Sequence, residues 1–332
     1  MSDALRSPAA TLRTLGMALA AALALTAHAA AGPLGDLAHV ETRGDGERHM
    51  ILIPGLGQDW TVWEGFMSRN GERYTMHAVT LPGFGGSEAP KLPEDASRYA
   101  WMDNAVEAVT ALIENAGLQD TVVMGHGSLG GFVAMRVGME RADLVEHIIA
   151  VDAMAPGLPL PGSATGVIPY QERLQLVEML GPMFLQFDED EWHNAVQNLD
   201  SHAIDADFGA KMQEISRKTP RSTGARYMVE LMATDLSPLM REAMIEGDAK
   251  VFMIYAIGES EGPASMPRQS RRAKDISAQI LEQSFGATVA IFNRSRPFIM
   301  HDHPGAFDGM IADYLEGEDV YDYFPPSPRR DE

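Results

Sequence analysis

Short apolar runs alternate with longer stretches of helical periodicity along most of this chain. Six runs are nearly continuous in apolar character, and most stop at a glycine, a proline or an aspartate: residues 49–53, 76–81, 121–124, 147–151, 251–256 and 288–292. Such runs predict strands that are buried on both faces of a sheet. Apolar positions at helical spacing predict helices at residues 102–116, 131–140, 276–285 and 306–315. The alternation predicts an α/β fold, with helices on both faces of a mainly parallel sheet.

One long segment interrupts this alternation. Residues 156–247 carry no strand pattern; they open with prolines and glycine and continue with four helical patterns. A helical block inserted between two strands is typical of a lid over the carboxyl ends of the strands, where such sheets bind ligands. We therefore expect a core built from residues 38–155 and 248–316, a helical lid at 156–247, and a disordered tail at 317–332.

The first 29 residues have the layout of a secretory signal peptide. Arg6 and Arg13 precede an apolar run at 15–26, and residues 27–29 read Ala-His-Ala, a small-x-small cleavage signal. The run is shorter than the roughly 20 apolar residues that a membrane-spanning helix needs. We expect cleavage after Ala29 and a periplasmic or secreted protein that has no membrane contact beyond export.

Charge and cysteine content exclude several kinds of function. Asp and Glu total 47 against 26 Lys and Arg, which leaves a formal net charge of −21. Nucleic-acid binding needs clustered Lys and Arg, so we expect no nucleic-acid partner. The chain has no cysteine, which excludes disulfides, thiolate zinc sites and thiol catalysis.

Residues 125–131 read Gly-His-Gly-Ser-Leu-Gly-Gly and lie between a predicted strand and a predicted helix. A glycine-flanked serine at such a turn is typical of the nucleophile elbow, a sharp turn that exposes the serine above the sheet. Here the sequence resembles the α/β-hydrolase superfamily. The resemblance extends over residues 38–316 and includes Gly-rich loops at 53–57 and 81–87 and a later loop at 296–304. It implies the α/β-hydrolase fold with an inserted helical lid, and serine-hydrolase activity without a cofactor.

The resemblance also implies roles for individual residues near the elbow. Ser128 is the expected nucleophile. The backbone amide of Leu129, just after it, and that of Leu56 in the first Gly-rich loop are the expected oxyanion hole. Backbone donors impose no side-chain identity, so these positions tolerate sequence change.

The triad acid should follow a strand between the serine and the histidine, which is the order of the family. Glu259 comes just past the predicted strand at 251–256 and is the first choice. Asp152, which ends the preceding strand, is the second choice, and Glu261 is the third.

The elbow departs from the family pattern by one residue. The family usually has a small residue two positions before the serine, whereas here that position is His126, as though Gly127 had been added. Either the strand bulges at Gly127 and Ser128 keeps the place of the nucleophile, or Gly127 takes that place and Ser128 moves into the first helical turn. Because glycine absorbs a bulge at low steric cost, we favour the first arrangement.

A second departure concerns the general base. The histidine of the family lies seven residues before a helix-starting proline, and counting back from Pro304 reaches Pro297, which cannot transfer a proton. His301 and His303 on the same loop are candidates to replace it, and His126 beside the elbow is a further candidate. His301 and His303 lack a matching distant partner, so we expect no metal site.

Two classes of function remain open. The first is a hydrolase that cleaves an ester or similar acyl substrate through Ser128 and an acyl-enzyme. The second is a catalytically impaired relative that binds a small apolar ligand under the lid. Gly127 and Pro297 favour the second class, because loss of a triad base lowers the rate by on the order of 10⁴- to 10⁶-fold. We favour the hydrolase, with a small acyl or apolar molecule as its partner; the sequence carries no signal about oligomeric state.

Overall fold

A computed structural model of the protein describes residues 37–92, 99–153, 170–257 and 268–320. Within these residues, seven strands form one sheet in the order β1-β3-β2-β4-β5-β6-β7. The strands are β1 (His39–Arg43), β2 (Arg48–Ile53), β3 (Tyr74–Thr80), β4 (Thr121–His126), β5 (Val145–Val151), β6 (Lys250–Ile257) and β7 (Thr288–Asn293). β1 pairs antiparallel with β3, and every other pairing is parallel. The predicted α/β fold with a mainly parallel sheet is confirmed.

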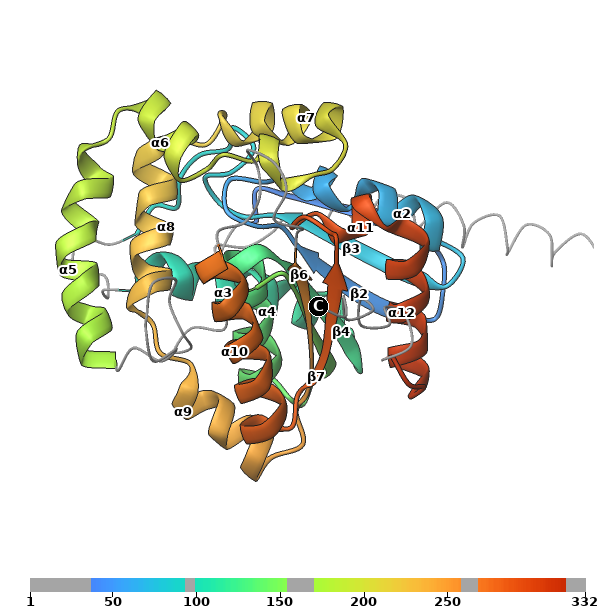
Figure 1. The fold of residues 1–332 in the computed structure, drawn as a ribbon. Helices are drawn as coiled ribbons and strands as arrows, with labels where there is room; N and C mark the ends of the chain where they lie inside the picture. The colour runs from blue at the N-terminus through green and yellow to red at the C-terminus, as the bar shows by residue number, and fades with distance from the viewer. Residues whose placement is uncertain (1–36, 93–98, 154–169, 258–267, 321–332) are drawn as a thin grey trace, which may run out of the picture. The chain divides into compact units, whose positions relative to one another are not determined.

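Helices cover both faces of this sheet (Figure 1). One face carries α3 (Ala100–Asn115), α4 (Gly127–Glu140) and α10 (Arg268–Phe285); the other carries the 3-10 helix η1 (Trp60–Trp63), α2 (Glu64–Asn70), α11 (Ile299–Asp302) and α12 (Pro304–Glu316). Along β2, Ile51 and Ile53 pack toward the first layer, whereas Met50 and Leu52 pack toward the second. Burial of both faces explains why the inner strands are continuous apolar runs. β1 was not predicted, because an edge strand that reads His-Val-Glu-Thr-Arg has only one aliphatic residue.

A helical insertion lies between β5 and β6. It comprises α5 (Tyr170–Gln186), α6 (Glu189–Ala195), η2 (Asp200–His202), α7 (Ala206–Ser216), α8 (Arg221–Ala233), α9 (Ser237–Met240) and the short π-helix η3 (Arg241–Glu246). α6 begins with a capping box in which Asp188 and Glu191 each accept the other's backbone amide. In Figure 1, α6 and α7 lie beyond the carboxyl ends of the strands. The function of this insertion as a lid stays a prediction.

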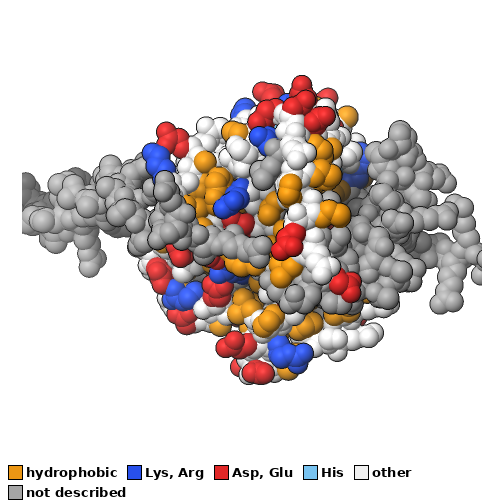
Figure 2. Space-filling model, turned by 90° about the vertical axis from the view of Figure 1, so that its left-hand side faces the viewer, with side chains coloured by type: hydrophobic (Ala, Val, Ile, Leu, Met, Phe, Trp, Pro, Cys, Tyr) orange, Lys and Arg blue, Asp and Glu red, His pale blue; other side chains and the backbone are white. Residues whose placement is uncertain are grey.

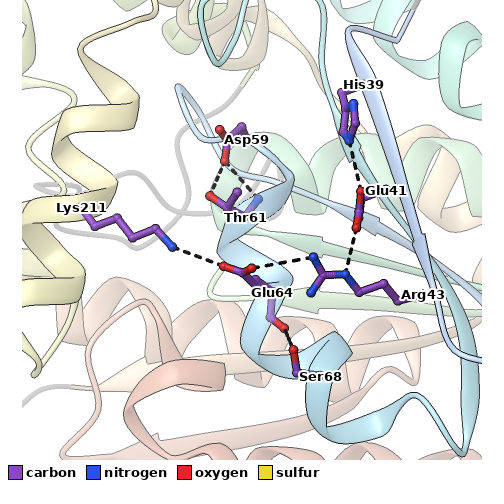
Figure 3. A network of polar contacts seen from close by, with 8 residues as sticks. All are labelled: His39, Glu41, Arg43, Asp59, Thr61, Glu64, Ser68 and Lys211. Atoms are coloured by element: carbon purple, nitrogen blue, oxygen red, sulfur yellow. Dashed lines mark hydrogen bonds and ion pairs between the residues drawn. The ribbon is translucent and has the colours of Figure 1, made fainter.

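Polar contacts join the insertion to the core at several places, including two on its helices α7 and α8. Figure 3 shows Lys211 of α7 beside Glu64 of α2, at 3.4 Å, with Arg43 of β1 on the other side of Glu64, at 3.7 Å. On α8, the buried carboxylate of Glu230 accepts two backbone amides at the amino end of α3, each at 3.0 Å. Both contacts hold helices of the insertion against the core.

The face that α5 and α8 present mixes hydrophobic with charged side chains (Figure 2), and Met179 and Met183 of α5 are 63% and 40% exposed. No helix in the described ranges has the length and apolar character needed to cross a bilayer. The predicted signal peptide and residues 321–332 of the predicted tail lie outside the described residues.

Candidate active site

Gly127 makes the turn between β4 and α4. Its φ of +62° is a left-handed conformation that residues with a Cβ adopt only with strain. β4 pairs residue by residue with β5 from Val122 to His126, and the shift in this ladder lies before Val122. From the sequence we favour a bulge at Gly127 that leaves Ser128 in the place of the nucleophile. The strand end is not bulged there, so this prediction is wrong. Instead Gly127 occupies the turn and Ser128 lies in the first turn of α4, because the left-handed conformation falls on the residue without a side chain.

The residues at this turn are open to solvent on one side. Gly127 and Ser128 are partly exposed, whereas His126 and Leu129 on either side are buried. Among the described residues, the Ser128 hydroxyl has no hydrogen-bond partner. The amide that directly follows the turn belongs to Ser128, and that of Leu129 is one residue further along. An oxyanion hole at this turn would therefore pair Leu56 with Ser128 and not with Leu129.

A glutamine that the sequence patterns do not single out organises the neighbouring loop. The side-chain oxygen of Gln58 accepts a hydrogen bond from the Gly55 backbone amide at 3.0 Å, and the backbone amide of Gln58 donates to the Gly55 carbonyl at 3.1 Å. The same side-chain oxygen lies 2.9 Å from Nδ1 of His126. Gln58 thereby joins the loop that carries Leu56 to the end of β4. Its position one residue past the Gly-rich stretch is the only sequence signal that points to it.

The contacts of the His126 ring prevent it from acting as the general base for Ser128. Its Nε2 lies 3.0 Å from the carbonyl oxygen of Pro297, and its ring stacks on Phe298 at a centroid distance of 4.9 Å. Burial lowers the pKa of His126 to about 4, so the ring is neutral at pH 7. Both ring nitrogens face oxygens that only accept, so the single proton of the neutral ring donates to one of the two, Gln58 Oε1 or the Pro297 carbonyl. Both nitrogens are thus directed at groups other than Ser128.

His301 and His303, the two loop histidines expected as replacement bases, also point elsewhere. The His301 ring stacks on Phe208 of α7 at 3.7 Å, and its Nε2 lies 3.3 Å from a carboxylate oxygen of Asp205. Nε2 of His303 faces the carbonyl of Arg294 at 3.4 Å. The loop winds into α11, which turns both side chains toward the insertion and β7. In the part of the chain that the structure describes, no imidazole bonds to the Ser128 hydroxyl.

Asp152, the second choice for the triad acid, is committed to a buried ion pair. Its Oδ1 accepts from the ammonium of Lys274 at 2.5 Å and from the Ala256 amide at 3.0 Å. Lys274 also donates to the Ala256 carbonyl at 2.9 Å, and both charged side chains are 7% exposed. The pair therefore gives hydrogen-bond partners to the backbone amide and carbonyl of Ala256, near the end of β6. It does not orient an imidazole. Asp152 adopts a φ of +51°, which strains a residue with a side chain.

The other two candidate acids, Glu259 and Glu261, lie outside the described residues. Lys274 was not anticipated, because a lysine on a helix is normally a surface residue. Its burial depends on Asp152, which lies 122 positions earlier in the chain.

Comparison with known proteins gives two kinds of likeness. A family model described as "Alpha/beta hydrolase family" matches residues 50–309. Over 111 residues the chain is 32% identical to (lyso)-N-acylphosphatidylethanolamine lipase of Bos taurus, a match that covers 33% of this chain and 31% of the relative. It is 30% identical over 112 residues to pimeloyl-[acyl-carrier protein] methyl ester esterase of Proteus mirabilis, covering 33% of this chain and 38% of the esterase. The chain thus matches about a third of the length of these curated relatives.

The likeness to solved structures extends further but concerns the fold alone. An esterase from Exiguobacterium antarcticum superposes with a TM-score of 0.61 at 16% identity, covering 84% of this chain and 95% of that one. The superposition confirms the arrangement of sheet and flanking helices.

Proposed function

Because the chain belongs to the alpha/beta hydrolase family, we propose that it keeps the binding site of that family without the serine triad. In this proposal it binds a small apolar molecule that carries an acyl or similar carbonyl group, beneath the helical insertion. The relatives named above are hydrolases. This relationship supports a ligand that carries an acyl group. The ligand is held and not cleaved by an acyl-enzyme route.

One observation carries this proposal: the turn residue is a glycine. Gly127 has the left-handed backbone expected at a strained strand-to-helix turn, but it has no hydroxyl to attack with. The position of the family base is Pro297, and the nearby His126 ring is occupied by Gln58 and the Pro297 carbonyl. Removal of triad members typically lowers kcat by on the order of 10⁴- to 10⁶-fold.

The space at the turn supports ligand binding. Among the described residues, and apart from its chain neighbours and its own helix, a Cβ placed on Gly127 would meet only Gly55 Cα, at 3.7 Å. A ligand atom therefore fits where a nucleophile side chain would otherwise lie. The amides of Leu56 and Ser128 suit a carbonyl oxygen of the ligand. The partly exposed Leu56 side chain offers an apolar wall beside them.

Thermal shift with a medium-chain acyl ester tests the binding. We expect the ester to raise the Tm of the parent and of Gly117→Asn, but not of Gly127→Asn. Gly117 has a φ of +65° and open space around its Cβ position, so it matches the backbone change without touching the site. Asparagine tolerates the left-handed region better than most residues. An unchanged Tm of the parent, or an equal shift in Gly127→Asn, contradicts the proposal.

A second candidate function is hydrolysis through Ser128. It is favoured by the partly exposed Ser128 hydroxyl, one residue past the turn, and by the hydrolase relatives; Glu259 would then be its acid. A fluorophosphonate probe separates the two functions. Labelling of the parent that disappears in Ser128→Ala supports hydrolysis, whereas no labelling and no ester turnover above buffer support the non-hydrolytic function.

A further inference from the structure

Two histidines meet on the sheet far from the elbow. Nδ1 of His49 in β2 lies 3.2 Å from Nε2 of His77 in β3, and the two rings are nearly parallel, with an interplanar angle of 14°. The strands are adjacent and parallel, with Ile51 opposite His77. His49 therefore faces His77 diagonally on the same face of the sheet. Both side chains are partly exposed.

Thr42 completes this group from the third strand. It lies directly opposite His77 in the antiparallel pairing of β1 with β3, and its hydroxyl is 3.0 Å from Nδ1 of His77. A hydrogen bond from Nδ1 to this hydroxyl places the ring proton on Nδ1. The Nε2 lone pair is then the one directed at His49, which is how a second partner orients a metal-binding histidine.

We propose that His49 and His77 form a binding site for one borderline divalent transition-metal ion, such as Zn²⁺ or Cu²⁺. Metal–nitrogen bonds of about 2.0–2.1 Å place two ligand nitrogens about 2.9 Å apart at a right angle and about 3.3 Å apart at the tetrahedral angle. The observed separation of 3.2 Å lies in this range. Imidazole is the nitrogen ligand that these ions prefer in proteins.

Binding needs two neutral rings, each with one nitrogen lone pair directed at the ion. To bind, His49 carries its proton on Nε2 and the rings turn about χ2, so that the ion replaces the hydrogen bond between them. No cluster of three or more His, Cys, Asp or Glu side chains in the described ranges is arranged around a metal, so water completes the coordination.

Calorimetric titration of the untagged full chain with ZnCl₂ and CuSO₄ tests the site. We expect one ion per chain and a rise in Tm, both lost in His49→Asn and in His77→Asn. Thr42→Val should weaken binding by about tenfold or more, because it removes the orienting partner. His39→Asn is the matched control: His39 lies on the same edge strand as Thr42 but pairs with Glu41 (Figure 3).

Metal-free Tm and circular dichroism show whether each variant is folded. If a folded His49→Asn or His77→Asn binds the ion like the parent, the site is wrong. The same conclusion follows if the parent binds no ion, or if binding is lost in His39→Asn.

Discussion

Restoring a nucleophile and a base at the two altered positions should create esterase activity. The change is Gly127→Ser together with Pro297→His. A serine Cβ fits at position 127, since the nearest atom of the described residues, outside its chain neighbours and its own helix, would be Gly55 Cα at 3.7 Å. The proline replacement leaves the backbone carbonyl that faces His126 in place. The hydrogen bond between the His126 ring and the backbone carbonyl of residue 297 can therefore persist in this variant.

The size of the effect follows from the surroundings of the two positions. A serine at a φ of +62° costs about 1–2 kcal/mol, which lowers the Tm by about 2–8 °C in a chain of this size. General base catalysis contributes about 10²- to 10⁴-fold. Because Asp152 is held by Lys274 and cannot orient the new imidazole, we expect the lower end, a rise of about 10²-fold over the parent. Nucleophile and base act as a unit, so each single change should give almost nothing.

Initial rates of 4-nitrophenyl acetate hydrolysis, corrected for buffer, measure this gain. Gly127→Ala with Pro297→His is the matched control, because it has the same backbone strain and the same imidazole but no hydroxyl. If this control is as fast as the serine variant, the activity does not come from the turn position. If the parent is already fast and Ser128→Ala abolishes its activity, Ser128 holds the nucleophile role and our reading of Gly127 is wrong.

Three other outcomes are expected. Lys274→Met should lower the free energy of unfolding by about 3–5 kcal/mol in urea, since Asp152 would remain buried without a partner; adding Asp152→Asn should recover part of the loss, and an unchanged midpoint would contradict the buried pair. Because the folded pKa of His126 is about 4, below its ordinary 6.5, the unfolded state protonates first as the pH falls. Stability should then drop between pH 6.5 and 4 by up to roughly 3 kcal/mol, and His126→Asn should show a shallower slope; equal slopes would argue against a buried neutral ring. N-terminal sequencing of protein from the native host should begin near Ala30, and a chain that starts at Met1 would contradict export.

Much of the fold could be predicted from local patterns. Five of the six apolar runs became the inner strands β2 to β6, and the sixth became β7 at one edge of the sheet. Helices cover both faces of this parallel sheet, so most positions on these strands are buried and apolar. The glycine-rich turn at residues 125–131 and the proline at 297 also stood out in the sequence, since each is a departure from a recognisable local pattern. Edge strand β1 was not predicted, because its sequence contains a single aliphatic residue.

The details of the candidate site were decided only by the tertiary structure. Whether Gly127 or Ser128 makes the turn is a question of backbone dihedrals and strand register, and both arrangements fit the same letters. The partner of Asp152 lies 122 positions away, and the carbonyl that occupies His126 lies 171 positions away. Such partners lie on elements that are far apart in the sequence, and only the packing of these elements brings the side chains together. The sequence thus determined which elements form and which residues depart from the expected pattern, and the packing determined which partners the candidate side chains have.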